Sequence, residues 1–161
     1  MTTDDAYLLL TKFFQERNAP RQALSALREG VEIGIKIGAT GYREHEAHLE
    51  CAVFRKGHDI QLERRKPRSP DFTFSLAPET VVVLANGTSD DVGDIGLGIF
   101  KEMLTGGVAV QMPGRLISVL RNGYFEVVAT GGPQVAAFLA QAGLSSPARI
   151  IGFLKSLRKP A

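Results

Sequence analysis

Strands that are apolar on one side only are the feature that most restricts the fold of this 161-residue chain. Apolar and polar residues alternate in Val31–Ile37, and the same period of two recurs in Ala47–Phe54, Ile60–Leu62 and Phe72–Leu76. Because successive side chains of a strand point to opposite faces, each of these strands has one face that must be covered. The strands also lie close together in the sequence. We therefore expect an antiparallel sheet of about five strands with helices on one face, in an α+β fold.

Segments with helical periodicity supply the expected cover. Thr3 or Asp4 is expected to cap a first helix, and Asn18-Ala19-Pro20 breaks it and starts a second, with Pro20 in the first turn. Two later units, Phe72–Ala85 and Val108–Arg121, each predict a strand, a proline turn and a short helix that stops at Asn-Gly. The β-rich Tyr124–Ala129 predicts another strand. Two helices, over residues 134–142 and from Pro147 onward, complete the expected order of elements.

A glycine-rich apolar helix is expected between the two repeated units, over Asp91–Leu104. Ser89 and Asp90 can cap its start, and Gly106 ends it. Its apolar residues cover more than half of its circumference, so it is either buried on two sides or lines a cavity. The three glycines within it oppose helix formation by about 1 kcal/mol each, so the helix needs tertiary packing. A mobile lid and close helix packing across small residues are the two alternatives.

Length and charge exclude several classes of protein. A chain of 161 residues predicts a single domain, 1–161, and its net charge of +2 gives no reason to expect a nucleic-acid-binding protein. No apolar run approaches the roughly 20 residues of a membrane span. The single cysteine, Cys51, and an acidic start without a basic secretion signal predict a cytoplasmic protein.

None of the potential catalytic or metal-binding residues forms a convincing site. The histidines of His45-Glu46-Ala47-His48 are three apart, whereas a helical zinc motif needs a spacing of four, so a solvated strand edge is the better interpretation. Asp90, Asp91 and Asp94 are explained by helix capping. Cys51 falls on the apolar face of a strand, where it acts as a small hydrophobic residue. No metal or cofactor is expected.

The densest cluster of charge is the basic loop of Arg64, Arg65, Lys66 and Arg68. Such a loop could attract phosphates or make transient contact with an anionic membrane surface. It lacks the interleaved aromatic residues of a base-stacking site. A solvated loop is the alternative interpretation.

The order of elements resembles that of the sterol carrier protein family. The resembling segments are Val31–Ile37, the hairpin Leu49–Glu63 with Gly57 in its turn, Asp71–Glu79 and Asn122–Leu139, within a likeness that extends from about Tyr7 to Gly143. An aspartate that opens a strand running through a serine into a short helix is typical of this family. The segment Thr88–Gly114 departs from the family pattern. The resemblance implies a curved antiparallel sheet covered by helices around an apolar tunnel, and it implies lipid carriage.

We therefore predict a non-catalytic protein that binds a lipid, fatty-acyl or sterol-like ligand in an apolar cavity. A ligand-free interaction or accessory domain on the same scaffold is the alternative, and an enzyme has the least support. The predicted ligand-binding residues lie on the glycine-rich helix and on the helices expected opposite it: Ile95, Ile99, Phe100, Met103, Leu104, Ile117, Leu120 and Phe138.

Overall fold

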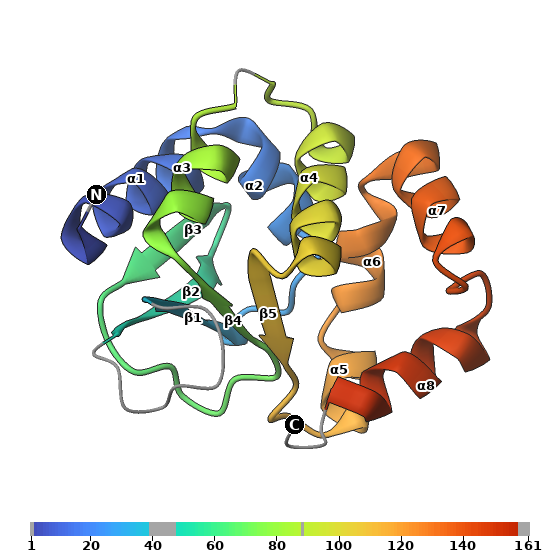
Figure 1. Cartoon of the computed structure of the whole chain (residues 1–161). Coiled ribbons are helices and arrows are strands. Elements are labelled where there is room, and N and C mark those ends of the chain that lie inside the picture. The colour runs from blue at the N-terminus through green and yellow to red at the C-terminus, as the bar shows by residue number, and fades with distance from the viewer. Residues whose placement is uncertain (1, 39–47, 88, 158–161) are drawn as a thin grey trace.

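The structure, a computed structural model, describes residues 2–38, 48–87 and 89–157 (Figure 1). It is an α+β fold, as predicted. The strands are β1 (Glu32–Ile37), β2 (Leu49–Lys56), β3 (Asp59–Glu63), β4 (Thr73–Leu76) and β5 (Val108–Gln111). The helices are α1 (Thr3–Glu16), α2 (Asn18–Leu24), α3 (Pro78–Ala85), α4 (Val92–Thr105), α5 (Leu116–Arg121), α6 (Tyr124–Ala129), α7 (Gly132–Gln141) and α8 (Pro147–Leu157).

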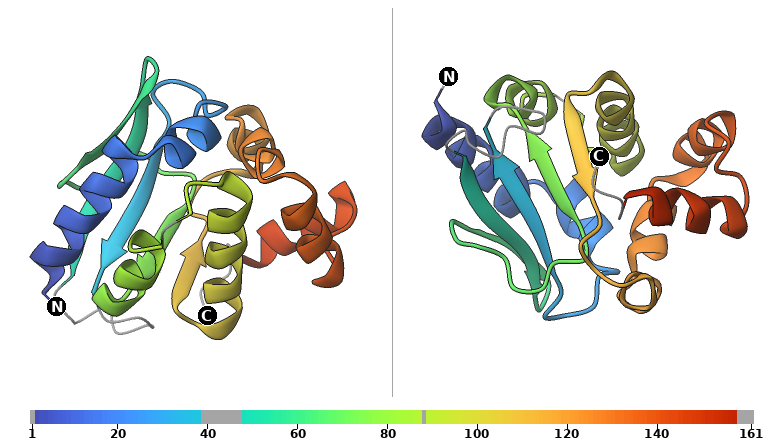
Figure 2. Two further views of the ribbon diagram at one scale, coloured as in Figure 1. Left: turned by 90° about the horizontal axis from the view of Figure 1, so that it is seen from above. Right: turned by 60° about the horizontal axis from the view of Figure 1, so that its bottom comes forward.

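The five strands form one sheet in the order β3-β2-β1-β4-β5. The predicted hairpin is confirmed as β2 and β3, and Gly57 in its turn has a φ of 64°. The prediction of a fully antiparallel sheet is wrong, because β1 and β4 pair in parallel. Strand β2 of the hairpin pairs with one edge of β1, which leaves the other edge of β1 free to pair with β4. The sheet is therefore mixed (Figure 2).

The first hydrophobic core lies between the sheet and α1 and α3. Leu76 and Val108 of the strands are buried there with Ala6 and Leu10 of α1 and Val81 of α3. The apolar stripe of α1 agrees with its predicted spacing. Its N-cap is Thr2, not the predicted Thr3 or Asp4, and the Thr2 hydroxyl accepts a hydrogen bond from the backbone N–H of Asp5 at 3.1 Å. Helices thus cover one face of the sheet, as the alternating strands require.

A second core lies just beyond the first residue of β4 and the last residue of β5. Phe72 and Met112 are buried there against Val119 of α5 and Leu154 of α8. Figure 1 shows the C-terminal helices α5–α8, coloured orange to red, gathered to one side of the sheet beyond β5. The chain therefore uses one sheet to support two separate clusters of buried side chains.

The segment Tyr124–Ala129 is helix α6, and the predicted strand there is wrong. The backbone N–H of Val127 donates to the carbonyl of Gly123 at 3.0 Å, which closes the first turn. Tyr124 and Phe125 pack against the second core, and the Tyr124 ring lies 4.8 Å from the Phe72 ring between centroids. Tertiary packing therefore overrides the β propensity of these residues.

A buried polar contact joins the sheet to the C-terminal helices. Asp71, which is 5% exposed, accepts a hydrogen bond of 2.6 Å from the side-chain amide of Asn122 at the end of α5. Its backbone carbonyl accepts from the N–H of Gly114 at 3.3 Å. The residue that opens β4 therefore also fixes both ends of the segment that contains α5.

Candidate functional site

Helix α4 is apolar, yet Gly93 is its only buried residue. Its large apolar side chains are all partly or fully exposed, including those of Phe100 and Met103. In a helix that packs against a sheet strand and a second helix, we would expect the central apolar side chains to be buried. The cover around α4 is therefore incomplete among the described residues.

Glycines hold α4 close to α7. A methyl group on Gly93 would lie 2.7 Å from the carbonyl oxygen of Gly131, and one on Gly96 would lie 3.4 Å from Val135. Further along the two helices, the rings of Phe100 and Phe138 lie 6.3 Å apart between centroids. The glycine stretch therefore supports close helix packing, one of the two alternatives considered for it.

On its other side α4 contacts β5, where the helices leave two strand side chains incompletely covered, and we call this incomplete cover the gap. Phe74 and Val110 are direct partners across β4 and β5, and both are only partly buried. The next pair on the same face, Leu76 and Val108, is buried in the first core. Two residues in the other direction, Phe72 and Met112 are buried in the second core.

The gap and the incompletely covered part of α4 belong to the same region. Met103 of α4 packs against the first core together with Phe74 and Val110. Phe100, one helical turn before Met103, contacts Phe138. We call Phe74, Val110, Phe100, Met103 and Phe138 the apolar seam. Its residues come from two strands and two helices, and Phe74 and Val110 pack against both cores.

The predicted ligand-binding residues fall into two groups. Ile95, Ile99, Phe100 and Met103 share α4, and Phe138 lies beside Phe100. Leu104 is 70% exposed at the end of α4, and Ile117 and Leu120 are 52% and 42% exposed on α5, whose main packing partners are α6 and α8. The structure does not bring these last three residues to the seam.

Two seam residues were missing from the predicted set. Phe74 and Val110 are not on α4 or a helix opposite it but on the strands below. The alternation of Phe72, Phe74 and Leu76 with Thr73 and Ser75 already places Phe74 on the covered face. That pattern could have identified the residue, whereas the gap in its cover depends on how the helices pack.

Two clefts in the described part of the chain lie away from the seam. One, of about 280 Å³, lies where α4 and α7 begin, and the other, of about 220 Å³, lies beside the loop that follows β3. The first is lined by Gln22, Asp90, Asp91, Val92, Gly93, Thr130, Gly131, Gly132, Pro133 and Gln134. None of the predicted ligand-binding residues lines either cleft.

The three aspartates at the start of α4 all accept hydrogen bonds, but the prediction that Ser89 and Asp90 cap this helix is wrong. Asp91 is the N-cap of α4 and accepts from the backbone N–H of Asp94 at 3.0 Å. Asp90 instead accepts from Asn18 and Ala19 at the start of α2, at 3.2 and 2.9 Å. A hydrogen bond of 2.7 Å from the Ser89 hydroxyl lowers the pKa of Asp94.

The other potential chemical groups are also accounted for where the structure describes them. Cys51 is fully buried, and burial raises the pKa of its thiol to about 12, so it is a poor nucleophile. His45, Glu46 and Ala47 lie outside the described residues. Within the described ranges, no cluster of three His, Cys, Asp or Glu side chains could hold a metal ion, and no helix is long and apolar enough to cross a membrane.

The basic loop after β3 is less free than the sequence suggested. The Arg64 guanidinium lies 2.9 Å from the Asp4 carboxylate. Arg65 holds both oxygens of Glu32, at 2.8 and 2.7 Å, and the backbone N–H of Arg68 donates to the same carboxylate. Two of the four cations are therefore paired within the chain, which weakens the case for this loop as a membrane contact.

The Glu32 carboxylate should give the protein a pH-dependent term in its stability. The hydrogen bonds from Arg65 hold the pKa of Glu32 below its ordinary value of 4.5. The stabilisation is therefore complete above the unfolded pKa and is lost as the pH falls through the folded pKa. Because a quarter of the Arg65 side chain is exposed, we expect Glu32→Gln to cost only about 1–2 kcal/mol at neutral pH.

Urea unfolding of wild type and Glu32→Gln at neutral pH and below pH 4.5 measures this term. The difference between the two proteins should shrink at the lower pH. Glu29→Gln is the matched control, because Glu29 is exposed and, among the described residues, accepts a hydrogen bond only from the N–H of Gly57, at 3.0 Å. A difference that stays constant with pH would contradict a role for the ionised Glu32.

Comparison with known proteins adds a likeness in fold. The sequence matches no family model and no curated protein. The solved structures that match include a UbiJ-SCP2 ubiquinone synthesis protein, with 16% identity over 80% of this chain and 88% of that chain and a TM-score of 0.42. A second match is the sterol carrier protein domain 2 of Helicoverpa armigera, with 16% identity over 88% of this chain and 90% of that chain and a TM-score of 0.46. A third is the apo form of sterol carrier protein 2 from Yarrowia lipolytica, with 12% identity over 78% of this chain and 88% of that chain and a TM-score of 0.38.

All three of these similar structures carry a sterol carrier protein or SCP2 name. This is the resemblance that the order of elements in the sequence predicted. The similarity concerns the fold alone, and the function proposed below rests on the chain's own residues.

Proposed function

We propose that this protein is a non-catalytic binding protein for an apolar ligand of the fatty-acyl or sterol-like class, held at the apolar seam. The observation that carries the proposal is the partly buried pair Phe74 and Val110. On one side of it lies the buried pair Leu76 and Val108, and on the other lie the buried residues Phe72 and Met112. A gap of this kind lets a ligand bury side chains that the helices leave uncovered. The seam is apolar on all the elements that line it.

The energetics of such binding need few polar contacts. Each methylene group transferred from water to an apolar site contributes about 0.8 kcal/mol, so a long acyl chain gains affinity from its length. The rings of Phe100 on α4 and Phe138 on α7 would provide apolar surface for contact with such a ligand. The proposal needs no bond-making group, and the inert Cys51 is consistent with that.

The anchoring of α4 supports entry of a ligand beneath its C-terminal half. The side-chain amide of Gln134 donates to Asp91 and Asp94, at 3.3 and 3.2 Å, which ties the start of α4 to the start of α7. The other end of α4 stops at Gly106, in a left-handed conformation with φ 87°. We infer that Met103 and Phe100 move more readily than the capped first turn.

Thermal unfolding of delipidated protein with and without a long-chain fatty acid tests the proposal. A ligand that binds only the folded state raises the midpoint, by the equivalent of about 2.7 kcal/mol at one hundred times its dissociation constant. No shift across a panel of fatty acids, acyl esters and sterols would reject the carrier function. It would favour the interaction domain, for which the exposed Leu104 and Ile117 are the supporting observation.

The variant Phe100→Asp separates a ligand site from an ordinary core. A carboxylate in the seam should abolish fatty-acid binding and lower stability much less, because Phe100 is only partly buried. Leu8→Asp is the matched control, since Leu8 is 59% exposed on α1, away from the seam. The control should bind as wild type does. Equal losses of binding and stability in Phe100→Asp would instead indicate that the ring is only part of the core.

A further inference from the structure

Charge is divided unevenly along this chain. Residues 1–102 contain 16 of the 17 acidic residues and 13 of the 19 lysines and arginines, a net charge of −3. Residues 103–161 contain six basic residues and a single acidic one, Glu126, a net charge of +5. The total of +2 therefore hides a basic C-terminal third, whose described residues form the end of α4, β5 and the helices α5–α8.

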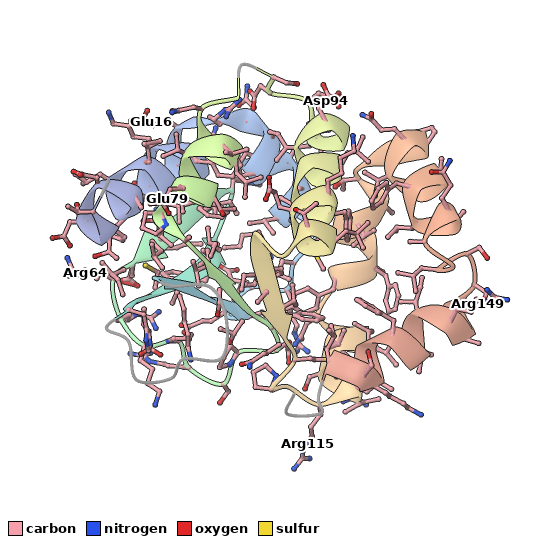
Figure 3. All side chains as sticks on the ribbon, viewed as in Figure 1. Glu16, Arg64, Glu79, Asp94, Arg115 and Arg149 are labelled. Carbon is pink, nitrogen blue, oxygen red and sulfur yellow. The ribbon has the colours of Figure 1, made fainter. Side chains whose placement is uncertain are left out.

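The basic residues of α5 and α8 are exposed and unneutralised. Arg121 of α5, Arg149 and Lys155 of α8, and Arg115 just before α5 make no ion pair with any described residue. Neither helix contains an acidic residue. Figure 3 shows Arg115 and Arg149 projecting away from the body of the protein. This contrasts with Arg64 and Arg65, which are paired with carboxylates.

Large apolar side chains are exposed on the same two helices. Ile117 and Leu120 of α5 are 52% and 42% exposed, and Phe153 of α8 is 37% exposed. The opposite sides of these helices, including Val119 and Leu154, are buried in the second core. Helices α5 and α8 pack against each other and lie together at the lower edge of the molecule (Figure 1).

We propose that the outward surface of α5 and α8 docks on a bilayer that contains anionic phospholipid. Such a surface attracts the four cations and gives the three exposed apolar side chains an apolar layer to enter. We call these seven residues the docking face. The other exposed large apolar residues, Leu8, Val83, Leu104 and Val128, lie on helices that contain acidic residues. These acidic residues are Asp4 and Asp5 of α1, Glu79 of α3, Asp94 and Glu102 of α4, and Glu126 of α6.

The mixture of charge and aliphatic side chains favours a bilayer over nucleic acid. A nucleic acid would neutralise the arginines but would leave Ile117 and Leu120 against hydrated phosphates. A bilayer takes up both kinds of side chain at its interface. The docking face is independent of the proposed ligand site, since it shares no residue with the apolar seam.

Flotation of the full chain with lipid vesicles tests the docking face. Phosphatidylcholine vesicles that contain phosphatidylglycerol should bind the protein, and pure phosphatidylcholine should bind it far less. Binding should weaken as salt is raised. Each basic residue near an anionic surface contributes about a fivefold change in partitioning, so Arg121→Gln/Lys155→Gln should bind roughly 25-fold more weakly.

Matched variants make the test specific. Lys12→Gln/Lys56→Gln removes the same charge from exposed positions in the N-terminal part and should bind as wild type does. Ile117→Ser/Phe153→Ser keeps the net charge and should still lower vesicle binding. If Arg121→Gln/Lys155→Gln does not fold, Arg115→Gln/Arg149→Gln replaces it. Equal loss in the lysine control, no preference for anionic vesicles, or binding to duplex DNA through these residues without vesicle binding would each overturn the proposal.

Discussion

Replacing Gly123 with alanine is expected to lower the free energy of unfolding by about 3–4 kcal/mol. Gly123 links α5 to α6 with a φ of 94°, a left-handed conformation that costs an alanine about 1–2 kcal/mol. An added methyl group would also lie 3.1 Å from the carbonyl carbon of Ala26 and closer still to its oxygen. The adjacent hydrogen bond of 2.9 Å from the N–H of Arg28 to the carbonyl of Asn122 prevents the two segments from separating freely.

Gly106→Ala is the matched control for this prediction. Gly106 has a similar φ of 87°, but an added methyl group there would meet nothing within 4 Å. Its cost should be the conformational term alone, about 1 kcal/mol. Urea unfolding of both variants measures the difference. Equal losses would show that the contact with Ala26 does not constrain the corner between α5 and α6.

Removing the Asp71 carboxyl group is expected to cost about 2–4 kcal/mol. Asp71→Ala leaves the Asn122 amide without its partner in a part-buried position and opens a space at the start of β4. A double-mutant cycle with Asn122→Ala isolates the energy of their contact. A coupling energy near zero would contradict the role of this pair in fixing the C-terminal helices to the sheet.

The neighbouring Tyr124 provides the control for this cluster. Its hydroxyl is buried close to the Asp71 carboxylate, but it makes no hydrogen bond of good geometry with the described residues. Burial, with a further contribution from the nearby Asp71, raises the pKa of Tyr124, so the phenol stays protonated. Tyr124→Phe removes an unsatisfied hydroxyl and should leave stability unchanged or slightly higher. A loss as large as that of Asp71→Ala would show that the hydroxyl does bond to the carboxylate.

Much of the fold could be predicted from local patterns because those patterns directly reflect burial. The alternation in β1, β2 and β4 records one covered face, and Pro78 and Asn86 mark the two ends of α3. The pairing of β1 with β4 could not be predicted in the same way. Its direction depends on the return of the β2–β3 hairpin, which no property of residues 32–37 specifies. Likewise, Tyr124–Ala129 has strand-like residues, and the second core makes them helical.

The candidate site was predictable only in part, for a related reason. Phe100 and Met103 follow from the periodicity of α4, and their closeness to Phe138 follows from helix packing. The exposure of Ile117 and Leu120 was not predictable, because an apolar residue on a short helix looks the same in sequence whether it faces the core or the solvent. Which side of α5 is covered depends on where α8 docks.

The parallel pairing of β1 and β4 also has a consequence for how the chain reaches its native state. The β2–β3 hairpin is local and can form early, and β1 can pair with β2 soon after it. The other edge of β1 pairs only with β4, which begins at Thr73. Contacts between distant segments form slowly because closing the intervening loop costs entropy. We expect the β1–β4 contact to form in the rate-limiting step of folding. Helices α5–α8 should pack afterwards, because Phe72 and Met112 of the second core are brought together only when β4 and β5 have paired.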